Sequence, residues 1–153
     1  MRRKDRQIES SEAVEDILRR ACVLHLAMAD GDRPYVLPLS YGYDGNAIYL
    51  HSAGEGRKID VLRAAPQVCF SVHVDTELTR GERPCGWSFA YRSVVGEGTV
   101  AFVEETEEKR RGLDALMRQH DGDGGDYAPD TLERTAILRI DITSLSGKQA
   151  GYE

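Results

Sequence analysis

Apolar and polar residues alternate over much of the chain with the two-residue period of strands that bury one face. This alternation predicts strands at 22–29, 35–43, 47–52, 67–75, 86–104 and 135–143. The turn sequences DGDRP and DGN separate the first three strands and predict antiparallel hairpins. Gly96 and Gly98 indicate a bulge or bend in the longest strand.

Three segments repeat apolar residues at helical spacing instead, which predicts short amphipathic helices. The first helix follows a serine cap at Ser10 or Ser11 and buries Val14, Ile17, Leu18 and Ala21. The second covers 57–65 and ends at Pro66. The third covers 105–120, with Leu113, Leu116 and Met117 as its buried stripe, and an exposed acidic loop is expected at 121–130.

The order of these elements indicates the fold class. Helices interrupt the strands without alternating with them one for one, so a doubly wound sheet fits poorly. We expect a mainly β fold, namely a small closed or nearly closed antiparallel barrel with a few peripheral helices. At 153 residues and 17.0 kDa, the chain is expected to form a single domain over 1–153.

Composition removes several classes of function. The formal net charge of -6 argues against a general nucleic-acid binder, which must neutralise many phosphates. No apolar run approaches the roughly 18 residues of a membrane helix, and MRRKDRQIES lacks the apolar core of a signal peptide, so a cytoplasmic location is expected. Cys22, Cys69 and Cys85 show no CxxC spacing, which predicts neither a disulfide framework nor a metal site; Cys22 and Cys69 are expected to be buried.

One stretch, YLHSAGEGRKIDVLR, combines features of an anion site. A strand end leads through a glycine-flanked turn into a helix that begins with Arg57 and Lys58. Backbone N–H donors, the hydroxyl of Ser52 and two cations would converge there, which suits a phosphate dianion. The alternative is a solvated basic turn that contacts a nearby acid such as Asp60 or Glu55.

The surrounding motifs resemble a known family. YVLPLSYGYDGNAIYLHSAGEGRKIDVLRAAPQVCFSV, followed by YRSVVGEGTV, is similar to the flavin-binding split barrels related to pyridoxamine 5'-phosphate oxidase. The nitroimidazole-resistance branch is the most similar, and MRRKDR, FVEETEEKRRGLDALM and ERTAILRIDITSLSGK extend the resemblance over most of the chain. It implies an FMN-binding split β-barrel that forms a homodimer and builds each flavin site from both chains.

The resemblance also implies the site residues. The strand along the flavin ring matches 35–39, with main-chain groups of Val36, Leu37 and Pro38 facing the ring and Leu39 closing the strand. His51, Ser52, Arg57 and Lys58 would hold the ribityl chain and phosphate, and Ser93 would lie near the ring. Leu39 stands where the oxidase has a lysine, and LSGKQAGYE lacks the oxidase's substrate-binding tryptophan and arginine, so vitamin B6 oxidation is not expected.

The expected activity is that of an FMN-dependent oxidoreductase that passes electrons from a reduced nicotinamide to a small organic acceptor, with nitroaromatics as candidates. A single cationic helix start neutralises one terminal phosphate, which favours FMN over a dinucleotide. His51 is the candidate catalytic residue, because relatives carry a histidine in the matching HSA motif and an imidazole donates protons near neutral pH. Its alternative role is only to hydrogen-bond phosphate or backbone.

Two other functions fit the same barrel. One is a non-catalytic flavin carrier, or a haem binder in which His51 or His73 ligates iron. The other is a reductase that uses a deazaflavin. Trp87, Phe89 and Tyr91 share one face of the long strand, and such aromatics belong to a core or to an interface, where they can also flank the ring.

Overall fold

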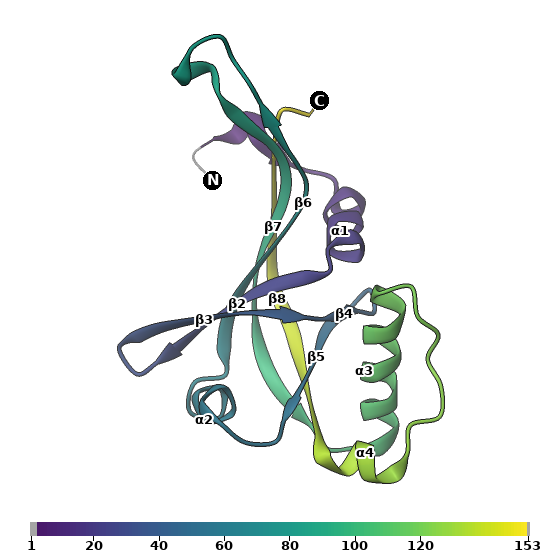
Figure 1. Ribbon diagram of the computed structural model, residues 1–153. Coiled ribbons are helices and arrows are strands. Elements are labelled where there is room, and N and C mark those ends of the chain that lie inside the picture. Colours follow the sequence, from purple (N-terminus) through teal and green to yellow (C-terminus); the bar gives the residue numbers. More distant parts are fainter. Residues whose placement is uncertain (1–2, 153) are drawn as a thin grey trace.

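The structure is a computed structural model, and it describes residues 3–152. Within these residues the strands form one antiparallel eight-stranded sheet in the order β3-β2-β6-β7-β8-β5-β4, and β1 pairs with β8. The strands are β1 Gln7–Ile8, β2 Val23–Asp30, β3 Arg33–Ser40, β4 Gly42–Tyr43, β5 Ala47–Ala53, β6 Gln67–Thr79, β7 Ser88–Val103 and β8 Thr135–Ala150. Only Tyr41 separates β3 from β4, so the two ends of the sheet are joined through the chain and the barrel closes (Figure 1). The mainly β barrel expected from the sequence is confirmed.

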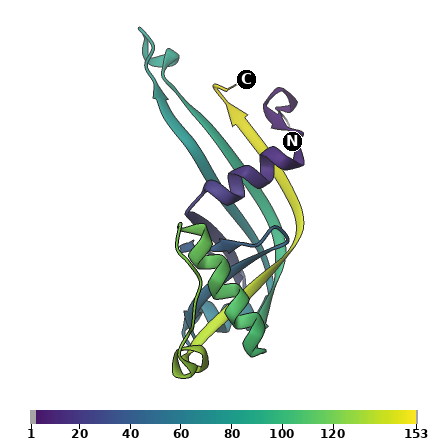
Figure 2. The same cartoon turned by 90° about the vertical axis from the view of Figure 1, so that its right-hand side faces the viewer.

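The helices occupy different sides of this barrel (Figures 1 and 2). They are α1 Ser11–Arg20, α2 Arg57–Ala64, α3 Thr106–Gln119 and α4 Pro129–Arg134, with short 3-10 turns at Lys4–Arg6 and Pro84–Gly86. Apolar residues of α1 and α2 join the core inside the barrel, whereas α3 packs on the outer side of β5. In the described part of the chain, no helix is long and apolar enough to cross a membrane.

The predicted serine cap of α1 and the predicted bulge near Gly96 and Gly98 are both confirmed. The hydroxyl oxygen of Ser10 accepts a hydrogen bond from the backbone N–H of Ala13 at 3.2 Å, which caps α1. The register of β7 against β8 shifts between Glu97 and Gly98, as a bulge requires.

Two burial predictions are wrong. Cys22 is exposed because it lies just before β2, outside the alternating strand. Met117 is 42% exposed, whereas the small residues Gly112 and Ala115 are buried with Leu116, since α3 approaches the sheet closely.

Strand ends depart most from the expectation. β6 and β8 continue to Thr79 and Ala150, past the predicted ends at 75 and 143, because backbone pairing extends strands without any buried face to mark them. The predicted strand 35–43 divides at Tyr41, where its pairing partner changes from β2 to β5. The predicted loop 121–130 ends early, since α4 begins at Pro129.

Beyond Tyr91, β6 and β7 leave the barrel as a two-stranded arm (Figures 1 and 2). Its base is fixed at Asp75, a residue with φ +53° whose carboxylate pairs with Arg20 and, at 2.7 Å, with Arg92. These two hydrogen-bonded guanidinium groups lower the pKa of Asp75. The hydroxyl of Tyr152 donates to the Asp75 carbonyl at 2.7 Å, so the arm base is tied to α1 and to the chain end.

Gln119 joins the end of α3 to the end of α1. Its Nε2 atom donates to the carbonyl oxygens of Leu18, Arg19 and Ala21 at 2.9, 2.9 and 2.7 Å, and its Oε1 atom accepts from the N–H of Tyr43 at 3.1 Å. One amide therefore satisfies carbonyls that the helix end leaves without partners.

We expect Gln119→Glu to lower the free energy of unfolding by about 2 kcal/mol, because a carboxylate cannot donate to these carbonyls and lies at the negative end of the α1 dipole. Urea denaturation measures the change. The matched control is Gln67→Glu at an exposed position of β6, which should stay within about 0.5 kcal/mol of the parent. Equal midpoints for the two variants would contradict this role of the amide.

Candidate functional site

The start of α2 leaves two backbone N–H groups open. Gly56 is the N-cap and has φ +108°, a conformation that favours glycine. Its carbonyl accepts from the N–H groups of Ile59 and Asp60, at 2.9 and 3.1 Å. Within the described part of the chain, the N–H groups of Arg57 and Lys58 find no acceptor, and no side chain caps the helix. The helix start therefore presents two neighbouring donors to an anion.

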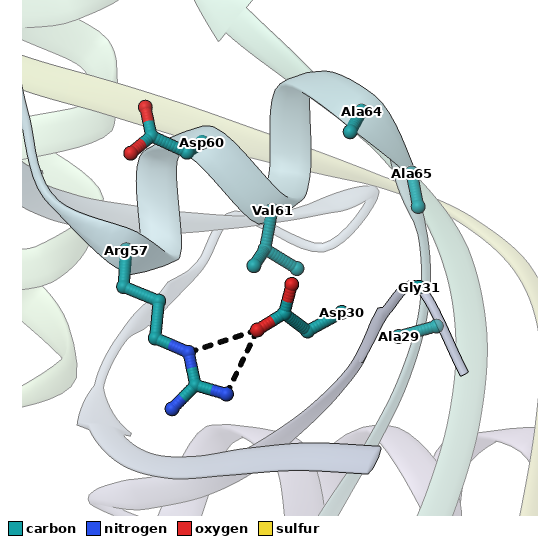
Figure 3. Close-up of a pocket in the computed structure, with 8 residues that line it drawn as sticks. All are labelled: Ala29, Asp30, Gly31, Arg57, Asp60, Val61, Ala64 and Ala65. Atoms are coloured by element: carbon teal, nitrogen blue, oxygen red, sulfur yellow. Dashed lines mark hydrogen bonds and ion pairs between the residues drawn. The ribbon is translucent and has the colours of Figure 1, made fainter. Parts of the chain in front are cut away.

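The Arg57 side chain turns from this helix start toward the hairpin of β2 and β3 (Figure 3). Its Nε and Nη2 atoms donate to Oδ2 of Asp30 at 3.0 and 2.8 Å, and its guanidinium carbon lies 4.3 Å from the centroid of the Tyr35 ring. The acid partner is thus Asp30, and not Asp60 or Glu55. Nη1 makes no hydrogen bond to any described residue, which leaves one edge of the guanidinium for a ligand.

Lys58 is the cation without a partner at this helix start. Its side chain is half-buried, and among the described residues it makes no ion pair. Burial lowers the pKa of the Lys58 ammonium, because desolvation disfavours its charged form. A bound anion would reverse that effect. The local electrostatics therefore favour an anionic ligand at Lys58 more than at Arg57.

A cleft of about 530 Å³ lies beside Arg57, between α2 and the turn that joins β2 to β3 (Figure 3). It is lined by Ala29, Asp30, Gly31, Arg57, Asp60, Val61, Ala64 and Ala65. Two carboxylates and one cation line it, and the cation is already paired with Asp30. This charge balance suits neutral or hydroxyl-bearing groups better than a phosphate.

β3 is an edge strand next to this helix. Among the described strands β2 is its sole neighbour, so its other edge presents unpaired N–H and C=O groups. Val36, 58% exposed, and Pro38 lie on the outer side, whereas Leu37 and Leu39 are half-buried against the core. The four residues expected along the flavin ring therefore divide into two that are open and two that anchor the strand.

His51 and Ser52 lie near the end of β5, at the same end of the barrel as the start of α2 (Figure 1). His51 is exposed and Ser52 is half-buried, and their register partners on β8 are Ile137 and Ala136. α3 covers the outer side of β5 at Tyr49, and His51 is the next outward position beyond this cover. The imidazole is thus uncovered at the end of β5 that leads into α2.

Ser93 is not brought to this place within one chain. It lies in the middle of β7, paired in register with His73 and Lys148, and its hydroxyl donates to the Lys148 carbonyl at 3.4 Å. β2 and β6 separate β7 from β3, which at about 4.8 Å per strand puts roughly 14 Å between them.

Asp30 and Tyr35 belong to the site but were missed by sequence reasoning. They lie more than twenty residues before Arg57, on the hairpin that α2 packs against. No spacing in the sequence links them to the helix, because this contact depends on how the hairpin and the helix pack. An acid in the turn sequence DGDRP was the sole available hint.

Comparison with known proteins agrees with this architecture. A family model described as pyridoxamine 5'-phosphate oxidase matches residues 10–149. An uncharacterized protein of Rhizobium meliloti (strain 1021) is 30% identical over 66 residues, which are 43% of this chain and 43% of that protein. The chain therefore spans less than half the length of this curated relative.

Two solved structures are similar over nearly the whole chain. One is a proposed 5-nitroimidazole antibiotic resistance protein from Bacteroides thetaiotaomicron, 30% identical, with a TM-score of 0.84 over 94% of this chain and 86% of that chain. The other is the FAD and heme binding protein from Mycobacterium smegmatis, 23% identical, with a TM-score of 0.81 over 96% of this chain and 74% of that chain. The second similarity concerns the fold alone.

Proposed function

Because the chain belongs to the pyridoxamine 5'-phosphate oxidase family, we propose that it is an FMN-dependent oxidoreductase. Its electrons come from a reduced nicotinamide and pass to a small organic acceptor, with nitroaromatic compounds as the first candidates in view of the nitroimidazole-resistance relative. The start of α2 carries this proposal: among residues 3–152, Lys58 has no counter-ion there and two N–H groups have no acceptor, beside the open edge of β3. A terminal phosphate is the ligand that this donor set suits.

The charges around the helix start favour the mononucleotide. Lys58 and the two N–H groups suit one phosphate. In the neighbouring cleft Asp30 and Asp60 would repel a second phosphate, and Arg57 is already paired with Asp30. We therefore propose FMN in preference to FAD.

The residues present divide the work of binding among them. Bound FMN would supply the two-electron chemistry. The Lys58 ammonium and the N–H groups of 57 and 58 hold the phosphate, and the hydroxyl of Ser52 donates to the phosphate or the ribityl chain. The backbone edge of β3 orients the ring. His51, exposed near the end of β5, would hold on an imidazole nitrogen the proton that an acceptor takes up.

We also propose a homodimer with the flavin sites at its interface. Within one chain, Val36 and Pro38 are uncovered and Ser93 lies about three strand spacings from β3. A second copy on this side would cover the ring and could place its own Ser93 beside it. The site is therefore incomplete in a single chain.

The absorbance spectrum and the mass of any copurifying small molecule test the cofactor. We expect a flavin spectrum, the mass of FMN, bleaching by reduced nicotinamide under anaerobic conditions and reoxidation by a nitroaromatic compound. A Soret band would point instead to a haem binder, and affinity for deazaflavin alone to a deazaflavin reductase. Bound flavin that no nicotinamide reduces would identify a carrier.

His51→Ala should retain FMN affinity but slow reoxidation by the acceptor about 100-fold, since a positioned proton donor contributes roughly that much. Stopped-flow reoxidation of the reduced protein measures this step. His120→Ala, at the end of α3, is the matched control and should leave the rate unchanged. If reoxidation is equally fast in both variants, His51 has only a structural role.

A further inference from the structure

Two histidines lie side by side on the outside of the barrel. His25 belongs to β2 and His73 to β6, and these strands pair antiparallel with His25 opposite Ser71, two residues before His73. The two imidazole rings have centroids 6.2 Å apart and planes inclined by 16°. Both side chains are exposed, whereas the adjacent residues Leu24 and Val72 are buried in the core. The pairing of two strands of the barrel wall therefore holds two imidazoles next to each other.

The separation of the two rings suits a shared metal ion. An imidazole nitrogen binds Zn²⁺ at about 2.0–2.1 Å, which places the ion roughly 3 Å from the centroid of the ring. With that bond length, two rings that bind one ion have centroids about 5 to 6.5 Å apart, and the observed 6.2 Å lies within this range. Because both rings are exposed, rotation about their side-chain torsions can aim a nitrogen of each at a common point.

The positions around the pair on the same side of the sheet are uncharged. They are Val23, Ala27, Pro38, Ser71 and Ser93. Lys148 is the register partner of Ser93 on β8, two strands from His73, which at about 4.8 Å per strand puts roughly 10 Å between them. No ammonium or guanidinium group among these neighbours would repel a bound cation, and the net charge of -6 favours one in general.

The chain supplies two ligands here and leaves the other coordination positions open. Over residues 3–152, no cluster of three or more histidine, cysteine, aspartate or glutamate side chains is placed to hold a metal ion. Asp75, two residues beyond His73, is already paired with Arg20 and Arg92. An ion at the two imidazoles would therefore complete its coordination with water or with an oxygen of another molecule, as ions in open sites do.

We propose that His25 and His73 form a binding site for one divalent transition-metal ion of the group Ni²⁺, Cu²⁺ and Zn²⁺. Imidazole nitrogen is a ligand that all three ions accept, and Cu²⁺ should bind most tightly of them. Mg²⁺ should not bind, because it requires oxygen ligands. The site uses none of the residues assigned to the flavin, and the two rings are placed within one chain. No spacing motif marks it, since the two histidines are far apart in the sequence.

Isothermal titration of the full chain with Zn²⁺, after a chelator has removed bound metals, should show one ion per chain. His25→Ala and His73→Ala should each raise the Zn²⁺ dissociation constant at least about 10-fold, because the loss of a second-shell partner alone costs about 10–100-fold. His120→Ala, which removes an exposed histidine at the end of α3, is the matched control. It should leave the constant within about twofold of the parent, as a change at a distant site does.

The double variant separates one shared ion from two independent contacts. If the imidazoles share one ion, the second substitution should cost much less than the first, since the first already breaks the chelate. Electron paramagnetic resonance of bound Cu²⁺ should show coupling to two imidazole nitrogens in the parent and to one in each single variant. A parent that binds no Zn²⁺, single variants that bind like the His120 variant, or costs that simply add would each overturn the site. Flavin content is measured by its own absorbance, so failure of the cofactor proposal is a distinct result.

Discussion

Replacing Arg57 and Lys58 together by alanine should weaken FMN binding by about 3 kcal/mol or more, which is at least about 100-fold in the dissociation constant. Each charge-assisted hydrogen bond to a phosphate contributes roughly 1.5–3 kcal/mol. Most of the loss should come from Lys58, which has no counter-ion among the described residues, because in the parent protein Arg57 is already paired with Asp30. Fluorescence titration of the apoprotein with FMN measures the change.

Arg63→Ala is the control for this experiment, because Arg63 lies in the last turn of the same helix and stacks on Phe102. It removes an equal charge from α2 but leaves the helix start intact. FMN affinity should stay within about threefold of the parent. If the double variant binds FMN as tightly as the Arg63 variant, the phosphate does not lie at the start of α2.

Gly42→Ala should lower the free energy of unfolding by about 3 kcal/mol, at the upper end for one added methyl group. A Cβ atom at Gly42 would lie 2.3 Å from the carbonyl carbon of Ala115 and from the backbone nitrogen of Leu116. Both contacts are to helix backbone, which cannot rotate away as a side chain does. α3 would have to move off β4 and expose the small core that it shares with β5.

Urea denaturation compares this variant with Gly125→Ala. A Cβ atom at Gly125 meets nothing within 4 Å, so this change should alter stability by less than about 0.5 kcal/mol. Similar midpoints for the two variants would show that α3 does not lie against β4 as closely as described. Circular dichroism at the start of each titration confirms that both variants are folded.

The sequence predicted those helices and strands whose formation is indicated by a local signal, such as a capping residue or an alternating apolar pattern. Ser10 caps α1 through its own hydroxyl, and Val68, Phe70 and Val72 alternate because β6 has one buried side there. The arm could not be predicted in this way. Beyond Asp75, β6 is held by backbone pairing with β7 and buries neither side, so its polar residues indicate a loop.

The candidate site shows the same division. Arg57 and Lys58 were identifiable because a helix start with two cations is locally unfavourable. The sequence could not show that Arg57 is paired with an acid whereas Lys58 is not. Asp30 contacts Arg57 only because the β2–β3 hairpin packs on α2. Likewise the resemblance of its motif predicts Ser93 near the flavin ring, yet β2 and β6 separate its strand β7 from β3 within one chain.

Tyr41, the single residue between β3 and β4, limits which parts of the protein can change to alter its specificity. β3 and β4 form one stretch of chain that pairs with β2 at one end and with β5 at the other, and the Tyr41 ring between them is fully buried. The backbone proposed to orient the flavin is therefore as rigid as the barrel wall and is preorganised before any ligand arrives. Adaptation to new acceptors should accordingly arise in the arm and the connecting turns, whose rearrangement leaves the wall closed.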